Sequence, residues 1–127
     1  MSDTAISAQQ IRSVENYLKE YRFQGRLVRM DRYEREFFRQ RQDSSGEPSD
    51  QPIARAKMYE IRHFLMELPN SDEKLLLYYH YIKGESIERC AELLDKSRSS
   101  GFRLKKRALA LAATYWKRKE ERTQAST

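Results

Sequence analysis

The fold of this chain is decided by residues 84–109, GESIERCAELLDKSRSSGFRLKKRAL. Ser86 is a favourable N-cap residue and predicts a short helix ending at Leu94. The inner face of that helix, at helical spacing, consists of Ile87, Cys90, Ala91 and Leu94. Asp95-Lys96 predicts a tight turn, after which Ser97 caps a second helix running from Arg98 to about Lys119. Because the small side chain of Ala91 allows two helices to cross closely, the pattern predicts a helix-turn-helix.

The second helix of this motif has a polar, cationic outer face. Its predicted buried stripe is Leu104, Ala108, Leu111 and Tyr115. At about 100° per residue, the side chains that point outward or flank the outward face are Arg98, Ser99, Phe102, Arg103, Lys105, Lys106 and Arg107. Arginine can pair bidentately with guanine, a serine hydroxyl can bond phosphate or base, and long cationic side chains reach phosphates. We therefore expect this face to enter the major groove of double-stranded DNA, with Lys105, Lys106 and Arg107 on phosphates.

Phe102 is the one apolar member of the outward face, and three interpretations stay open. The ring contacts a thymine methyl group, packs on the preceding helix, or meets a partner protein.

The charge distribution favours the same end of the chain. The formal net charge is +6 and the isoelectric point is about 9.5, which suits a polyanionic partner. The segment Ser97–Lys119 carries eight positive charges and no negative one, whereas residues 71–96 carry four basic and six acidic side chains. The excess of positive charge is thus concentrated on the predicted second helix.

Upstream of the motif, two further helices are expected. Apolar residues at helical spacing from Ile53 to Leu68 predict a first helix, which Pro69-Asn70 ends. Ser71 caps the next, with Asp72 and Glu73 in its first turn, and Gly84 suits the left-handed position after its end.

The N-terminal third reads as one long helical region. Residues 1–42 form this extension, residues 43–52 a linker with two prolines, residues 53–119 the helix-turn-helix domain, and residues 120–127 a flexible polar tail. Within the extension a heptad-like stripe of Ile11, Val14, Leu18, Tyr21 and Val28 breaks at Gly25 and resumes on a shifted face as Met30, Tyr33 and Phe37. One kinked helix and two joined helices both fit. The stripe either pairs with a second chain, as in a coiled-coil homodimer, or folds back.

Residues 68–116 resemble the fourth region of sigma-70-type RNA polymerase sigma factors. The resemblance rests on Leu68-Pro69, the run from Leu75 to Ile82, Gly84-Glu85-Ser86, Cys90-Ala91, Leu94, Ser97 and Arg107-Ala108-Leu109. The helical extension and total length are similar to small phage and prophage regulators of the ArpU/RinA kind. The resemblance implies an all-α fold, a sigma region 4-like bundle and activation of transcription with bacterial RNA polymerase.

The chain departs from the sigma pattern at two places. Arg89-Cys90 stands where an acidic residue and isoleucine are usual, and Gly101 stands where an apolar residue is usual. Glycine inside a helix costs up to about 1 kcal/mol relative to alanine. The other sigma regions are not visible, so we expect a small regulator and not a complete sigma factor.

Other functions find less support in the sequence. We see no catalytic constellation and expect no cofactor and no metal site, since His63 and His80 lack the spacing of a metal pair. Cys90, the single cysteine, is expected in the core, and the chain is expected in the cytoplasm with no membrane partner. The main alternative is a sigma-like protein-interaction module that binds RNA polymerase or another regulator without reading DNA. An RNA-associated role is a third reading.

Overall fold

The chain folds into helices, in a computed structural model that describes residues 6–40 and 51–125. The elements are α1 (Ala8–Gln40), α2 (Pro52–Glu67), α3 (Asp72–Leu77), the π-helical segment η2 (Tyr78–Ile82), α4 (Ile87–Leu93) and α5 (Arg98–Ala125). No strand occurs within these described ranges, which confirms the predicted all-α class. No helix among the described residues is both long enough and apolar enough to span a bilayer.

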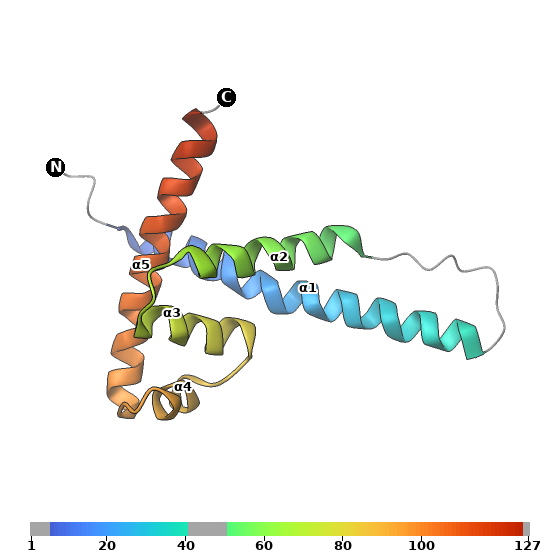
Figure 1. The fold of residues 1–127 in the computed structure, drawn as a ribbon, viewed down its shortest axis with the longest axis horizontal. Coiled ribbons are helices and arrows are strands. Elements are labelled where there is room, and N and C mark those ends of the chain that lie inside the picture. Colours follow the sequence, from blue (N-terminus) through green and yellow to red (C-terminus); the bar gives the residue numbers. More distant parts are fainter. Residues whose placement is uncertain (1–5, 41–50, 126–127) are drawn as a thin grey trace.

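α1 is one continuous helix of 33 residues that passes through Gly25 without interruption. It begins with a capping box, in which Ser7 Oγ accepts from the backbone N–H of Gln10 and the Gln10 side chain accepts from the N–H of Ser7. Figure 1 shows α2 lying alongside α1, and the two helices are in contact. A Cβ built on Gly25 would lie 3.4 Å from Met58 Cε of α2, an ordinary van der Waals contact, so the packing of the two helices does not require glycine at this position.

The heptad-like stripe of α1 is covered by the same chain. Val14 and Leu18 are fully buried, and Ile11 and Tyr21 pack against the core at its edge. α1 contacts both α2 and α5. For the part of the stripe from Ile11 to Val28, folding back is therefore confirmed, whereas Met30, Tyr33 and Phe37 remain exposed.

At the junction between α2 and α3, side chains cap the free backbone groups of both helix ends. α2 ends at Glu67, and the Lys74 ammonium donates to the carbonyls of Met66 and Leu68 at 2.9 and 3.2 Å. A cation at this place satisfies carbonyls that have no partner within the helix. Ser71 Oγ accepts from Lys74 N at 3.3 Å, so the predicted stop at Pro69-Asn70 and the predicted cap at Ser71 are both confirmed.

The helix that starts at Asp72 changes its winding before it ends. Residues 78–82 form a π-helical turn, in which Lys83 N–H donates to the carbonyl of Tyr78. The segment then ends at Gly84, whose φ is +78°. The sequence predicted a regular helix here, so the π-helical turn is a difference from that prediction. Within the segment Tyr81 is buried, while Tyr78 and Tyr79 are half-buried.

Two predicted boundaries differ from those of the structure. α5 continues to Ala125 instead of ending near Lys119, so residues 120–125 of the expected flexible tail are helical. α2 already begins at Pro52, inside the predicted linker, and its proline occupies the first turn, where a missing N–H costs nothing. Residues 43–50 of that linker and residues 126–127 of the tail lie outside the described residues.

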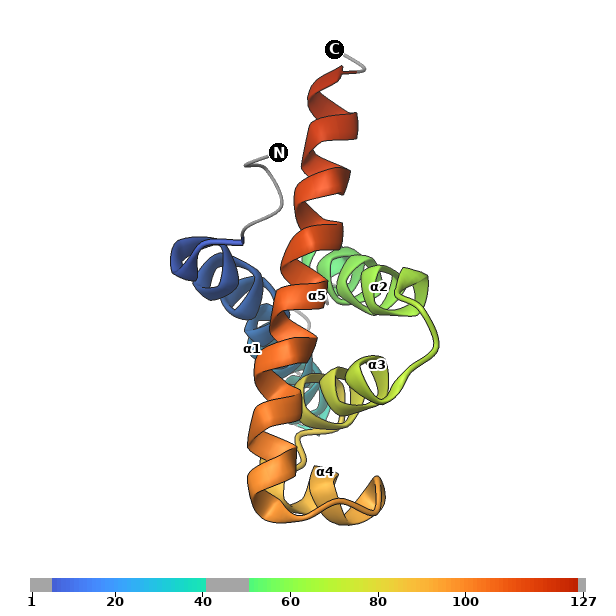
Figure 2. The same ribbon diagram turned by 90° about the vertical axis from the view of Figure 1, so that its left-hand side faces the viewer.

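One core joins the N-terminal helix to the rest of the chain. Its largest fully buried side chains are Leu18 from α1, Ile61 and Leu65 from α2, Leu76 and Leu77 from α3, Cys90 from α4 and Leu104 from α5, together with Val14. The first half of α1 is therefore an integral layer of the helical domain. α5 crosses the other layers, and its first turns lie beside α4 at one end of the molecule (Figure 2).

Candidate nucleic-acid interface

α4, its turn and the start of α5 form the two-helix unit that the sequence predicted. Ser86 Oγ accepts from Arg89 N at 3.1 Å and caps α4, and Ser97 Oγ accepts from Ser100 N at 3.2 Å and caps α5. Between the caps, Lys96 N–H donates to the carbonyl of Ala91 at 2.8 Å and Asp95 takes a φ of 61°. This is a Schellman-type ending with aspartate in the left-handed position that glycine usually occupies. The turn is therefore fixed by the backbone.

Gly101 lies where α5 crosses α4. A Cβ built on Gly101 would lie 2.9 Å from the Cβ of Ala91 and 3.6 Å from Ile87 Cγ2. From the sequence, Gly101 is a departure from the sigma pattern that is expected to loosen the second helix. In the structure the glycine is what permits the close crossing, with Ala91 as its small counterpart, so the loss of helix propensity is offset by packing.

The first three turns of α5 expose a polar and cationic surface, which we call the α5 face: Arg98, Ser99, Phe102, Arg103, Lys106 and Arg107. All six residues are exposed. The opposite side of α5 is buried through Gly101, Leu104, Ala108 and Ala112, with Leu109 and Ala113 beside them. The predicted stripe was correct for Leu104 and Ala108, whereas Leu111 and Tyr115 are only partly buried.

Two arginines of the α5 face have acidic neighbours at its edges, and a third contacts a serine. Arg98 Nη2 lies 3.4 Å from Glu88 of α4, and Arg107 Nε lies 4.0 Å from Glu73 of α3. Arg103 donates to Ser100 Oγ at 3.2 Å. Exposed ion pairs of this kind are weak, so these guanidinium groups can exchange a carboxylate for a phosphate at little cost.

Phe102 is 42% exposed, and the Arg98 guanidinium carbon lies 5.9 Å from the centre of its ring. The ring is thus only partly covered by its own chain, and its exposed part is accessible to a ligand.

Lys105 points away from the α5 face, toward α1. Its ammonium lies 3.5 Å from Glu15 Oε2, and only 29% of the side chain is exposed. Tyr81 donates a hydrogen bond of 2.5 Å to the same carboxylate oxygen. Burial alone would raise the pKa of Glu15, but the hydrogen bond from Tyr81 and the charges of Lys105 and Lys19 outweigh it and lower the pKa. Burial and the Glu15 carboxylate raise the pKa of the Tyr81 hydroxyl, so Tyr81 remains a neutral donor.

The Glu15–Tyr81–Lys105 network fixes α1 against η2 and α5 below the interface. The network was not predicted from the sequence, because its members are far apart in the chain and share no motif. Of the predicted site residues, Lys105 is drawn inward toward α1, whereas Arg107 stays exposed at the edge of the face, near Glu73 of α3.

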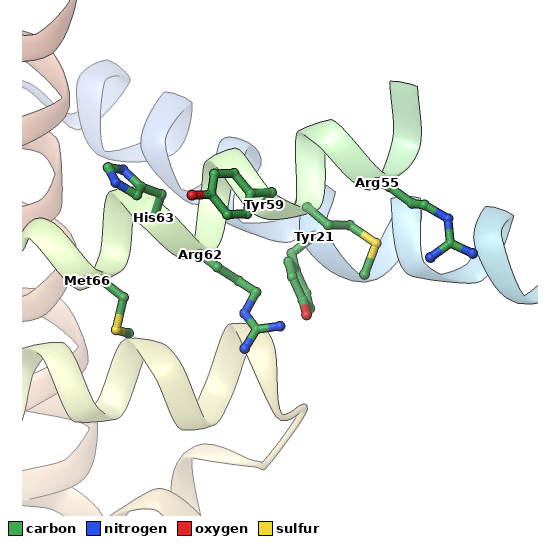
Figure 3. Close-up of a pocket in the computed structure, with 7 residues that line it drawn as sticks. Tyr21, Arg55, Tyr59, Arg62, His63 and Met66 are labelled. Atoms are coloured by element: carbon green, nitrogen blue, oxygen red, sulfur yellow. The ribbon is translucent and has the colours of Figure 1, made fainter. Parts of the chain in front are cut away.

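A second surface feature is an open pocket between α1 and α2, of about 520 Å³ (Figure 3). It is lined by Tyr21, Arg55, Met58, Tyr59, Arg62, His63 and Met66. Tyr59 stacks on His63, whose Nδ1 lies 3.2 Å from Glu67. These side chains do not form a nucleophile–base pair of the kind that covalent catalysis uses.

His80 and Cys90, two further residues of reactive type, have structural roles in the fold. His80 Nδ1 lies 2.7 Å from the carbonyl oxygen of Glu85 and supports the end of η2. Cys90 is fully buried as predicted, and burial together with the Glu85 carboxylate raises the pKa of its thiol. No group of three or more metal-ligating side chains occurs in the part of the chain that the structure describes.

Comparison of the chain with protein-family models, with curated proteins and with solved structures found no match.

Proposed function

We propose that this chain is a sequence-specific DNA-binding protein that regulates transcription, with the α5 face in the major groove of double-stranded DNA. The observation that carries the proposal is the exposed, cationic α5 face, which belongs to a two-helix unit with both helices capped. The major groove of B-form DNA is wide enough to admit one helix, and helix-turn-helix proteins present the first turns of the second helix to it.

The residues of the α5 face divide by chemistry. Arg103, near the middle of the face, is suited to bidentate contact with guanine, and Ser99 to a base edge or a phosphate. Phe102 offers an apolar contact to a thymine methyl group. Arg98, Lys106 and Arg107 at the margins are suited to phosphates, aided by the N–H groups at the start of α5. Lys105 reaches phosphate only if it leaves Glu15, so we rank it last.

The class of regulator that we propose rests on the resemblance to sigma region 4. By that resemblance, the chain is a phage- or prophage-type activator that acts with bacterial RNA polymerase in the cytoplasm. The capped turn and the close crossing of α4 and α5 fit such a unit.

One observation favours a second candidate, a protein-interaction module. A groove of about 450 Å³ between α2 and α3 is lined by Arg62, Met66, Asn70, Ser71, Lys74, Leu75 and Tyr78. Met66 is 50% and Leu75 42% exposed. An apolar groove with a charged rim is suited to a helix from another protein. Both activities can coexist, because the groove and the α5 face lie on different elements.

The test is selection of binding sites from a random duplex library, followed by titration of the selected DNA. We expect specific binding that weakens steeply as salt is added. Arg103→Ala should cost about 1–3 kcal/mol of specific affinity and relax the preference at one base pair. Arg12→Ala removes an exposed arginine from α1 and should leave the specificity unchanged.

Two results would contradict the proposal. The first is an Arg103→Ala variant with the same affinity and the same selected sequence as the original chain. The second is a selection that yields no preferred sequence although the protein is folded, which would favour the interaction module.

A further inference from the structure

The outer face of α1 carries a row of exposed apolar side chains, which we call the α1 stripe: Phe23, Leu27, Met30, Tyr33 and Phe37. They are between 39% and 72% exposed. Phe23, Leu27, Met30 and Phe37 follow the 4-3 spacing of a coiled-coil seam, with Glu34 at the one position between them. Single exposed apolar residues are ordinary, but a row of five on one helix marks an interaction surface.

The α1 stripe does not face the core of its own chain. Phe23 and Leu27 each lie two residues from the buried Gly25, and Met30 lies two residues from the buried Val28. A separation of two residues corresponds to about 200° around a helix, so the stripe and the buried face lie on opposite sides. The last turns of α1 also extend past the start of α2 (Figure 1).

The stripe is complementary to itself when two copies of α1 run antiparallel with Met30 at the centre. Residues at equal distances from Met30 then lie opposite one another. Phe23 of one copy faces Phe37 of the other, and Leu27 faces Tyr33. Arg26 and Glu34, both exposed, meet as opposite charges in the same way.

A parallel arrangement lacks this match. It would bring Glu34 of one copy against Glu34 of the other within the seam, and like charges in contact are unfavourable. The antiparallel arrangement has the closed two-fold symmetry of most homodimers, in which the same patch serves both copies. The surface between Met30 and Phe38 is also hollowed, with a depression of about 640 Å³ into which side chains of another helix can insert.

We infer that a second copy of this chain binds the α1 stripe, forming an antiparallel homodimer centred on Met30. Five side chains per copy make a small interface compared with the standard size of about 1,600 Å². The dimer is therefore reversible and forms as concentration rises. Its formation requires no DNA and does not depend on the proposed function.

Sedimentation equilibrium of the full chain without DNA, over a wide range of concentration, tests the dimer. The mass should rise from monomer to dimer. Met30→Glu places two glutamates at the centre of the seam and should raise the dissociation constant by about tenfold or more. Tyr59→Glu, at a 71% exposed site on α2, should leave it unchanged. A chain that stays monomeric throughout, or a dimer indifferent to Met30→Glu, would overturn the inference.

The charge pair and the direction of packing are tested by two further sets of variants. Arg26→Glu and Glu34→Arg should each weaken the dimer, and the double variant should restore it. Under mild oxidation, a mixture of the Phe23→Cys and Phe37→Cys chains should form a disulfide-linked heterodimer, while each chain alone should not. If each variant crosslinks to itself and the mixture gives no preferred heterodimer, the helices run parallel and the antiparallel arrangement is wrong.

Discussion

α1 and α5 are the two longest helices of the molecule, at 33 and 28 residues, and they differ in what they expose. Each contributes a buried stripe to the common core. On the opposite side α5 exposes mainly arginine, lysine and serine in its first turns, whereas α1 exposes phenylalanine, leucine, methionine and tyrosine. One outer face suits a polyanion and the other suits another apolar helix.

The comparison shows that helical periodicity alone does not identify the core face of a long helix. α1 has two apolar stripes on opposite sides, and both follow helical spacing in the sequence. Tertiary packing selects one of them, since Val14 and Leu18 are fully buried in the core whereas Met30 on the other side is exposed. α5 has a single apolar side, so its outer face could be predicted.

The largest expected effect separates the two stripes of α1. Leu18→Ala removes a fully buried side chain from the core and should lower the free energy of unfolding by about 2–5 kcal/mol. Met30→Ala truncates a 65% exposed side chain and should change the free energy of unfolding by less than about 0.5 kcal/mol. Urea denaturation followed by circular dichroism, at a concentration where the chain is monomeric, measures both. Equal effects would mean that the stripes are assigned to the wrong sides.

The next effect compares the helical glycines of α5 and α1. Gly101→Ala forces a Cβ to 2.9 Å from that of Ala91 and should destabilise the fold by about 1–3 kcal/mol. Gly25→Ala meets only the flexible end of Met58 at 3.4 Å, so the better helix propensity of alanine should dominate and add up to about 1 kcal/mol. Thermal melting of the two variants gives the signs. A stabilised Gly101→Ala protein would contradict the close crossing of α4 and α5.

A smaller and pH-dependent effect is expected at the contact between α1 and η2. Tyr81→Phe removes the hydrogen bond to the Glu15 carboxylate and should cost about 1.5 kcal/mol at neutral pH. Because the pKa of Glu15 is lowered in the fold, this stabilisation is fully present above the ordinary value of 4.5 and is lost as the pH falls through the lowered pKa. Denaturation of both proteins across the acidic range should show the difference shrinking.

Tyr59→Phe, at a 71% exposed site outside the α1 stripe, is the matched control and should show neither the loss nor its pH dependence. A constant difference between Tyr81→Phe and the original chain at all pH values would exclude Glu15 as the acceptor.

The smallest effect concerns the caps of the two long helices. Ser97→Ala removes the acceptor of Ser100 N–H and should cost about 1 kcal/mol. Ser7→Ala removes the acceptor of Gln10 N–H at the free end of α1, where fraying limits the loss to about 0.5 kcal/mol. Chemical denaturation resolves the larger change. A greater loss at Ser7 than at Ser97 would reverse the expected order.

Local signals predicted the ends of most elements correctly. The caps at Ser71, Ser86 and Ser97 and the left-handed Gly84 were predicted from residue type, because each satisfies backbone groups within its own few residues. The π-helical turn in η2 was not predicted, since no local pattern in Tyr78–Ile82 marks it. The outer face of α5 was placed correctly for all its predicted residues except Lys105, which a distant carboxylate on α1 draws inward.

By itself, then, the sequence determined that the chain is helical, where its short helices begin and end, and that the positive charge gathers on the helix starting at Arg98. These properties depend on neighbours within one or two helical turns. Only the tertiary structure decided that α1 folds back into the core, that Gly101 is required at a crossing, and which apolar stripe stays exposed. Those outcomes depend on distances between residues far apart in the chain, and spacing along one helix contains no measure of them.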